Sequence, residues 1–220
     1  MLITFSGLDG AGKSTLISYL KEELAKRGRE STVLTMYDHV GLYATVRRVR
    51  DTFRRVLGPS LGEKMSTDPD RLGGRKNADG LALLVVRSPL VKQIAHVFDL
   101  LLLIGCRIYT ELILGRVLIL DRYFYDSLAD IAGGPSSWIY IRWFLRFTPR
   151  PRVPLFIDVA PEIAFGRKQE YSVEYLRRRR DTYLRIFQLA RHPVVVLENS
   201  DLEQTRRQLI ALIADIAARK

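Results

Sequence analysis

Short apolar runs alternate along the chain with longer segments in which apolar residues recur every three or four positions. The short runs predict buried β-strands at residues 2–6, 31–36, 117–123, 155–159 and 194–197. The longer amphipathic segments predict helices at residues 13–27, 42–57, 89–114, 138–147, 161–168 and 173–190. A final helix should follow Ser200-Asp201-Leu202-Glu203, which has the sequence of a capping box.

This alternation of strands and helices is typical of a layered α/β domain. The first strand, the first helix and the second strand form a βαβ unit, which favours a parallel sheet with right-handed crossovers. We therefore predict a single domain over residues 1–220, with a five-stranded parallel sheet flanked by helices. Residues 58–80 combine Gly, Pro, Asp and Ser with little periodicity, and they predict a long surface loop.

A glycine-rich turn follows the first strand, and residues 7–14 match the eight-position phosphate-loop pattern. Glycines let backbone N–H groups wrap closely around phosphate oxygens, and the next helix directs its N-terminus at the same anion. Lys13 would add a cation, and Ser14 a hydroxyl ligand for Mg²⁺. A turn that merely caps a helix is the alternative, which the Lys-Ser pair argues against. The predicted ATP-binding residues are Gly7, Gly10, Ala11, Gly12, Lys13, Ser14 and Thr15.

Polar residues also follow two later strands, at the sheet edge where open α/β proteins bind ligands. Tyr37 and Asp38 come after the second strand, and Asp121 ends the third. Four apolar residues followed by Asp121 form the pattern by which phosphate-loop proteins place a carboxylate beside Mg²⁺. Asp126 lies further along the same predicted rim.

The segment 89–114 is apolar over most of its length. Such a helix requires cover on most sides, either in the centre of the domain or in a subunit interface, and we favour a homodimer that packs through it. Arg107 interrupts its apolar surface. The arginine either extends to solvent at an edge or reaches into a pocket.

Composition narrows the class of protein. The chain has 220 residues, 47% of them hydrophobic, and a formal net charge of +11 that suits an anionic ligand. Its richest apolar run, 97–104, is too short and too charged to span a bilayer. The lone Cys106 cannot form an internal disulfide, and no basic leader precedes the first strand, so we expect a cytoplasmic protein.

Three segments together resemble the thymidylate kinase family of the P-loop nucleoside monophosphate kinases. The first is the phosphate loop, residues 7–15, which includes an acid at Asp9. The second is Asp121-Arg122-Tyr123 with Ser127-Leu128-Ala129 after it. The third runs from Leu155 to Glu162 and is followed by Arg167.

The resemblance implies a three-layer P-loop kinase fold with an arginine-bearing lid at about residues 166–182. In that family pattern Lys13 and Ser14 hold ATP and Mg²⁺, and Asp121 supports the metal. Arg122 would bind the acceptor's phosphate, and Arg167 would neutralise the negative charge of the phosphoryl group during transfer. The predicted catalytic residues are Lys13, Asp9, Arg122 and Arg167, and the predicted acceptor contacts are Asp9, Tyr37, Asp38, Arg107, Arg122 and Asp126.

The residues that would bind the phosphate acceptor, which form the acceptor half of the site, depart from the family pattern. Tyr37-Asp38-His39 stands where the family has Arg-Glu-Pro, and Leu103 stands where a stacking aromatic residue is expected. The leading hypothesis is ATP-dependent phosphorylation of a nucleoside monophosphate, with dTMP as the first candidate. The alternatives are a kinase of the same fold for a nucleoside, another nucleotide or a sugar, and a nucleic-acid-associated ATPase. We expect neither nucleic acid nor a membrane as a partner.

Overall fold

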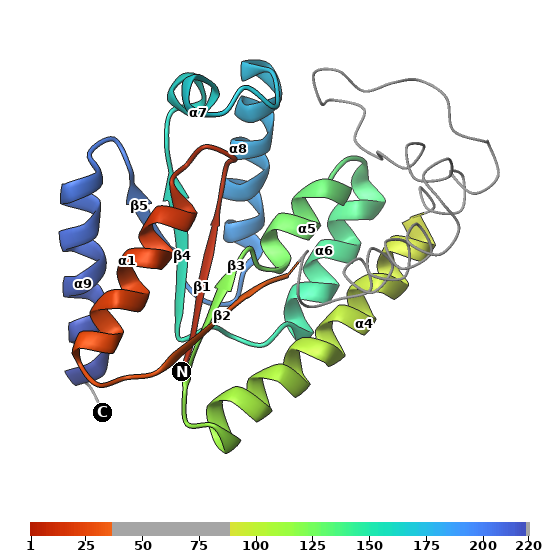
Figure 1. The fold of residues 1–220 in the computed structure, drawn as a ribbon. Coiled ribbons are helices and arrows are strands. Elements are labelled where there is room, and N and C mark those ends of the chain that lie inside the picture. Colours follow the sequence, from red (N-terminus) through yellow and green to blue (C-terminus); the bar gives the residue numbers. More distant parts are fainter. Residues whose placement is uncertain (37–88, 219–220) are drawn as a thin grey trace, which may run out of the picture.

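A computed structural model describes residues 1–36 and 89–218 of the chain. Within them, five parallel strands form one sheet in the order β2-β3-β1-β4-β5 (Figure 1). The strands are β1 (Leu2–Gly7), β2 (Ser31–Thr35), β3 (Val117–Asp121), β4 (Val153–Asp158) and β5 (Val195–Glu198). The predicted five-stranded parallel sheet is therefore confirmed.

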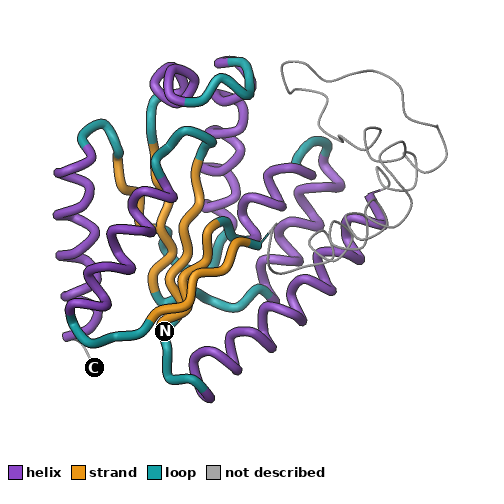
Figure 2. The backbone as a smooth tube through the Cα atoms, in the orientation of Figure 1, coloured by secondary structure: helices purple, strands orange, loops and turns teal. Residues whose placement is uncertain are grey.

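Helices cover both faces of the sheet. Those in the described residues are α1 (Lys13–Lys26), α4 (Pro89–Ile108), α5 (Phe124–Ile131), α6 (Pro135–Phe147), α7 (Pro161–Arg167), α8 (Val173–Leu189) and α9 (Leu202–Ala218). Figures 1 and 2 show α1 and α9 on one face, and α4, α5, α6 and α8 on the other. The short α7 lies beyond the carboxyl ends of the strands, which is the end of the sheet where β1 enters the phosphate loop.

The central strands are mostly apolar along their length because both of their faces are covered. Every residue of β1 and of β4 is buried, and β1 pairs with β3 on one side and β4 on the other. In α1 the buried apolar residues Leu16, Ile17, Leu20 and Leu24 form one stripe. The helix ends before Gly28, which has a φ of 68° and donates its N–H to the carbonyl of Ala25.

Several element ends differ from the predicted ones. The helix predicted over 89–114 is α-helical only to Ile108 and continues as a π-helical turn over Tyr109–Ile113. At the start of α9 it is Asp201, not Ser200, whose carboxylate accepts the backbone N–H of Glu203, at 2.9 Å. The predicted helix over 42–57 and the predicted loop over 58–80 lie outside the described residues.

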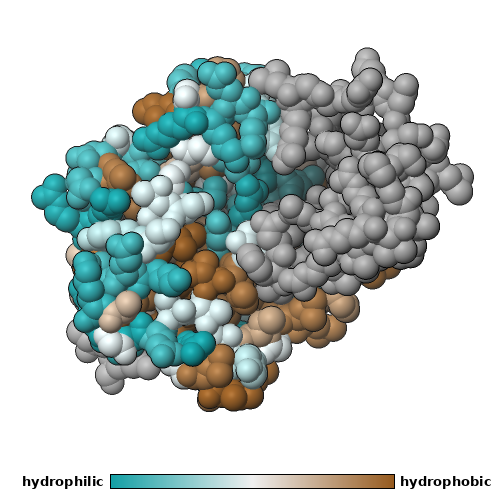
Figure 3. All heavy atoms as spheres, in the orientation of Figure 1, coloured by the Kyte–Doolittle hydropathy of each residue, from teal (hydrophilic) through white to brown (hydrophobic). Residues whose placement is uncertain are grey.

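The long helix α4 is not covered on most sides by the described part of the chain. Leu100 and Leu103 are buried against the domain, but Ile94 and Leu101 are 68% and 63% exposed. Figure 3 shows hydrophobic residues gathered along the outer side of this helix. None of the helices within the described residues is long and apolar enough to cross a membrane.

Candidate active site

The phosphate loop connects β1 to α1 and depends on glycine where other segments approach it closely, as they do at Gly10 and Gly12. Gly10 has a φ of 86°, and a Cβ at this position would lie 2.5 Å from the carbonyl oxygen of Ala164 in α7. Gly12 has a φ of 85°, and its Cβ would lie 2.5 Å from the side-chain nitrogen of Asn199. A side chain at either position would therefore be strained and would clash with its neighbours.

Lys13 is held inside the loop. Its side chain is 7% exposed, and Nζ donates to the carbonyls of Gly7 and Leu8 at 2.9 and 2.8 Å. Burial lowers the pKa of Lys13, and the charge of Arg122 lowers it further, against the opposing effect of nearby carboxylates. An ammonium has three donors, so one remains for a phosphate oxygen.

The tips of the two central strands meet, as the sequence predicted. In the parallel pair β1 and β3, Phe5 is the partner of Asp121, and the backbone N–H of Arg122 donates to the carbonyl of Phe5. Across the tips, the guanidinium of Arg122 is 2.5 Å from a carboxylate oxygen of Asp9. Arg122 has a φ of 70°, which is rare outside glycine and is often found at functional sites.

The two carboxylates at these tips differ in environment. Burial raises the pKa of Asp9, but the charges of Arg122 and Lys13 outweigh it and leave the pKa below the ordinary value. Asp121 has a raised pKa because burial outweighs the same cations. Its Oδ1 is buried without a hydrogen-bond partner, so it has an unused acceptor for a water or a metal ion.

Asp126, which the sequence suggested as an acceptor contact, accepts hydrogen bonds from three separate segments of the chain. The side chain is fully buried. One carboxylate oxygen accepts the hydroxyl of Ser6 at 2.7 Å and the backbone N–H of Tyr123 at 2.9 Å, and the other accepts the hydroxyl of Tyr183 at 2.8 Å. Asp126 thereby holds the Asp121-Arg122-Tyr123 turn against β1 and α8.

The four consecutive arginines of α8 point to different partners, because successive residues on a helix are about 100° apart. Arg177 pairs with Glu162, and Arg178 lies 3.8 Å from Glu174. Arg180 makes a two-pronged ion pair with Asp158 at the end of β4.

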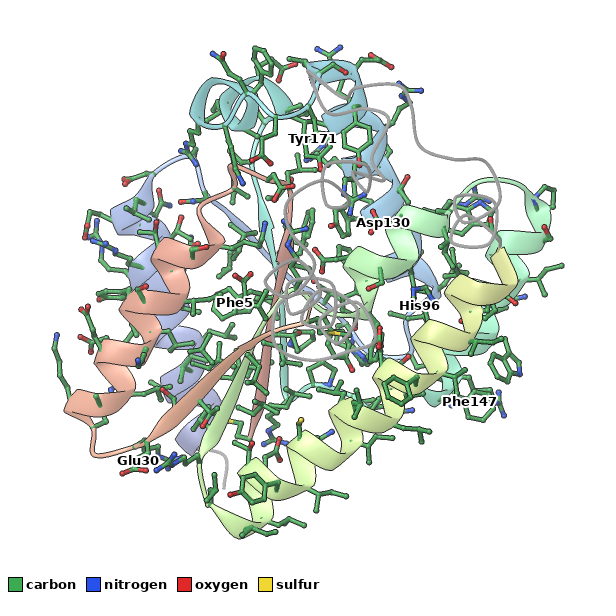
Figure 4. All side chains as sticks on the ribbon, turned by 45° about the vertical axis from the view of Figure 1, so that its right-hand side comes forward. Phe5, Glu30, His96, Asp130, Phe147 and Tyr171 are labelled. Atoms are coloured by element: carbon green, nitrogen blue, oxygen red, sulfur yellow. The ribbon has the colours of Figure 1, made fainter. Side chains whose placement is uncertain are left out.

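Only Arg179, of these four, reaches α5. Its guanidinium donates to Asp130 at 2.5 Å and to the carbonyl of Asp126 at 3.3 Å. Figure 4 shows Asp130 on α5, with α8 behind it. The charge of Arg179 also contributes to the lowered pKa of Asp9. Arg179 therefore acts electrostatically on the paired strand tips, while Arg180 binds the end of β4.

Arg167, at the end of α7, lies against the phosphate loop. Its guanidinium donates to the carbonyls of Gly10 and Asn199, at 3.4 Å each. Asn199 is a site residue that the sequence reasoning missed. The signal that could have found it is its position directly after β5, at the same sheet edge as the other strand tips.

The remaining predicted residues are placed as follows. Ser14 and Thr15 are exposed at the start of α1, beside a depression of about 410 Å³ that is also lined by Ser18, Tyr19, Glu22 and Arg206. Arg107 is not brought to this site. It bonds to Glu111 and to the carbonyl of Arg150, near the amino ends of the strands. Tyr37 and Asp38 lie outside the described residues.

Comparison with known proteins is consistent with this geometry. No family model matches the chain. The chain is 27% identical to a probable thymidylate kinase of Thermococcus kodakarensis, over 97% of both proteins. It is 33% identical to a thymidylate kinase of Chlorobium phaeobacteroides, over 76% of this chain and 65% of that relative. The solved thymidylate kinase of Candida albicans matches with a TM-score of 0.61 and 18% identity, over 100% of this chain and 93% of that one.

The fold is therefore that of the P-loop kinases: a five-stranded parallel sheet whose first strand ends in a phosphate loop. Relatives that align over nearly the whole chain point to one group within the P-loop kinases. Over most of its length the chain is similar to proteins named thymidylate kinase, and its fold matches that of a solved thymidylate kinase.

Proposed function

We propose that this protein is a nucleoside monophosphate kinase that transfers the γ-phosphoryl group of ATP to dTMP, giving ADP and dTDP. The observation that carries the proposal is the contact between Asp9 of the phosphate loop and Arg122 of the β3 tip, at 2.5 Å. This contact brings the phosphate loop and the β3 tip together, which supports binding of a donor triphosphate and an acceptor phosphate side by side at this edge of the sheet. The curated relatives named thymidylate kinase support this choice of reaction.

The donor half consists of the phosphate loop and the start of α1. Backbone N–H groups at residues 7–15 hold the triphosphate, and the helix N-terminus adds its positive end. Lys13 keeps its ammonium on the carbonyls of Gly7 and Leu8 and gives its third donor to a phosphate oxygen. Because the cation is fixed before the reaction, it stabilises the developing charge without reorganisation.

The residues at the strand tips also fit a magnesium ion. Ser14 offers a hydroxyl at the start of α1, and the unpartnered Oδ1 of Asp121 offers an acceptor for a metal-bound water. Mg²⁺ bound there would neutralise charge on the transferring phosphoryl group.

Arginines complete the acceptor half. The guanidinium of Arg122 has five donors, so it can bind Asp9 and an acceptor phosphate at once. Arg167 and the segment at about 166–182 form the lid, which closes over the transferring group. We retain Asp9, Tyr37 and Asp38 as acceptor contacts. Arg107 and Asp126 are not among the proposed contacts, because the structure gives them other partners.

Measuring ADP release with a panel of acceptors tests this proposal. We expect turnover with dTMP that exceeds turnover with other nucleoside monophosphates, nucleosides and sugars. Faster turnover with a nucleoside or a sugar would mean that the acceptor is not dTMP, while the proposed ATP-binding residues would still stand. ATP hydrolysis stimulated by DNA, with no phosphorylated small molecule, would instead favour a nucleic-acid-associated ATPase.

We further propose that the protein works in the cytoplasm as a homodimer that packs through α4. The outer side of this helix carries the exposed apolar residues Ile94, Val97, Phe98, Leu101, Ile104 and Ile108. A continuous apolar face of this kind is typical of a surface that a protein partner covers. A second copy of the chain supplies the same face, as a two-fold interface requires.

A further inference from the structure

Asn199 connects the turn after β5 to the phosphate loop. Its side chain is 2% exposed, and its backbone N–H donates to the carbonyl of Asp158 at 2.8 Å. The side-chain Nδ2 donates to the carbonyl of Ala11 at 2.7 Å. The sheet topology places the carboxyl ends of β1, β4 and β5 side by side, so this bond joins residues that are 188 positions apart.

The bond fixes the direction of one peptide group. In a trans peptide the C=O and the N–H point in opposite directions across a rigid plane. The carbonyl of Ala11 is drawn toward Asn199, so the N–H of Gly12 in the same plane points the other way. No hydrogen bond from that N–H to another described residue is present. It is therefore available to an anion, beside the start of α1.

We propose that Asn199 is a positioning residue, which orients the Gly12 N–H so that it donates to the triphosphate of the nucleotide donor. This inference rests on the proposed function, because it concerns the donor half of that site. Asn199 does not touch the phosphate itself. It acts through the Ala11–Gly12 peptide and sets the affinity for the donor, with no role in acceptor binding.

Two further observations indicate that the side-chain amide of Asn199 is required for its hydrogen bond and not only for packing. First, a Cβ on Gly12 would lie 2.5 Å from Nδ2, so the close approach of Asn199 depends on glycine at position 12. Second, Oδ1 of Asn199 is buried without a partner. An apolar side chain of similar size would fill the same space without that unsatisfied oxygen, so packing alone does not account for an amide here.

Arg167 likewise fixes the preceding peptide group, Gly10–Ala11, through a hydrogen bond to its carbonyl. One side of its guanidinium donates to the carbonyl of Gly10, and the other donates to the carbonyl of Asn199. The carbonyls of Gly10 and Ala11 are thus both held from the side of the loop where β5 and α7 end. The loop N–H groups are set by this support before any nucleotide arrives, which reduces the cost of binding.

Calorimetric titration with MgATP and, separately, with tripolyphosphate tests the inference. The test variants are Asn199→Leu, which removes the amide, and Asn199→Asp, which keeps the shape but replaces the donor with an oxygen. The matched control is Thr205→Val. Thr205 is fully buried near the start of α9, next to the turn that carries Asn199, and donates to the carbonyls of Glu198 and Asp201, with no bond to the phosphate loop.

We expect both Asn199 variants to bind each probe at least about tenfold more weakly, as loss of one directed donor would give. Asn199→Asp should lose more, because its carboxylate would face the carbonyl of Ala11. In steady-state kinetics KM for ATP should rise while KM for dTMP stays within about twofold. Thr205→Val should keep wild-type affinity for both probes.

Three outcomes would overturn the inference. Wild-type affinity in Asn199→Asp would show that the donor has no role, and this variant carries the test even if Asn199→Leu does not fold. An equal loss in Thr205→Val would assign the effect to the turn as a whole. A wild-type protein that binds neither probe would overturn the proposed donor site itself, and this inference with it.

Discussion

Lys13 is buried among the groups that would surround the transferring phosphoryl. Replacing it with alanine removes a buried cation together with its bonds to the carbonyls of Gly7 and Leu8. We expect Lys13→Ala to lower kcat by about 10²- to 10³-fold, the usual effect of losing one preorganised donor. A coupled ADP-release assay measures this. Lys26→Ala, at the exposed end of the same helix, is the control, and equal activity in the two variants would contradict the proposed role.

The ion pair between Asp9 and Arg122 predicts a dependence of stability on pH. Burial raises the pKa of Asp9, but neighbouring cations leave it below its ordinary value of 3.8. Because the folded-state pKa is the lower one, the stabilisation is complete above the unfolded-state pKa and is lost as the pH falls through the folded-state pKa.

We therefore expect a constant difference in unfolding free energy between the wild type and Asp9→Asn from about pH 5 to 7. Below about pH 4 the difference should shrink, because Asp9 becomes protonated in both states. Urea denaturation at successive pH values measures it. A difference that persisted unchanged to pH 2 would show that the charge on Asp9 contributes nothing.

Single residues were predictable where the chemistry is local. The phosphate-loop residues and the Asp121-Arg122 pair follow from patterns within a few positions of one another. The network around Asp126 was not predictable, because its hydrogen-bond partners Ser6 and Tyr183 are 120 and 57 residues away in sequence. A polar residue on a predicted rim does not reveal whether it points outward or into such a network.

At the scale of elements, the contact between α5 and α8 depends on buried hydroxyl and carboxylate groups. Tyr183 of α8 is fully buried, and it donates to Asp126 of α5. Tyr183→Phe removes only the hydroxyl and leaves the carboxylate one donor short. We expect the free energy of unfolding to fall by about 1–2 kcal/mol, measured in urea.

Tyr109→Phe is the control for this change, because Tyr109 is 54% exposed in the π-helical turn. A loss as small as the control's would mean that the Asp126 network does not hold α8 in place. If α8 carries the lid, Tyr183→Phe should also raise KM for the acceptor, since the helix would be less firmly fixed against the strand tips.

The elements themselves were largely predictable. Strands buried on both faces produce apolar runs, and Gly28 marks the end of α1 through its left-handed conformation. The N-cap residue of α9 was harder to predict, because Ser200 and Asp201 are both good capping residues. Only the geometry of the turn selects Asp201. The π-helical turn after α4 had no sequence signal that we recognised.

At the scale of the whole molecule, the exposed outer side of α4 predicts association. A stable interface buries roughly 1,200–2,000 Å² in total, which paired long helices with their neighbours can supply. Leu101 is 63% exposed near the middle of α4. We expect Leu101→Glu to shift sedimentation velocity from a dimer to a monomer at micromolar concentration.

Ile163→Glu is the matched control, since Ile163 is a partly exposed apolar residue on α7, away from α4. It should leave the dimer intact. A wild-type protein that sediments as a monomer would contradict the proposed interface, as would a Leu101→Glu variant that remains dimeric.

The whole-molecule arrangement also explains what sequence reasoning did not reach. The segment carrying Arg107 resembled a substrate-reading helix, but the direction of α4 places this arginine near the amino ends of the strands. Asn199 reaches the phosphate loop only because β5 follows β4 in the sheet. Both outcomes depend on tertiary packing, which local patterns do not encode.

The central claim is that the tips of β1 and β3 hold one continuous chain of phosphates. The most direct measurement is calorimetric binding of a bisubstrate analogue, in which adenosine and thymidine are joined through five phosphates. The account predicts that the analogue binds at least about a hundredfold tighter than ATP, as expected when two linked ligands occupy adjacent sites, and that Lys13→Ala and Arg122→Ala each weaken it. Affinity no greater than that of ATP, unchanged in Arg122→Ala, would contradict it.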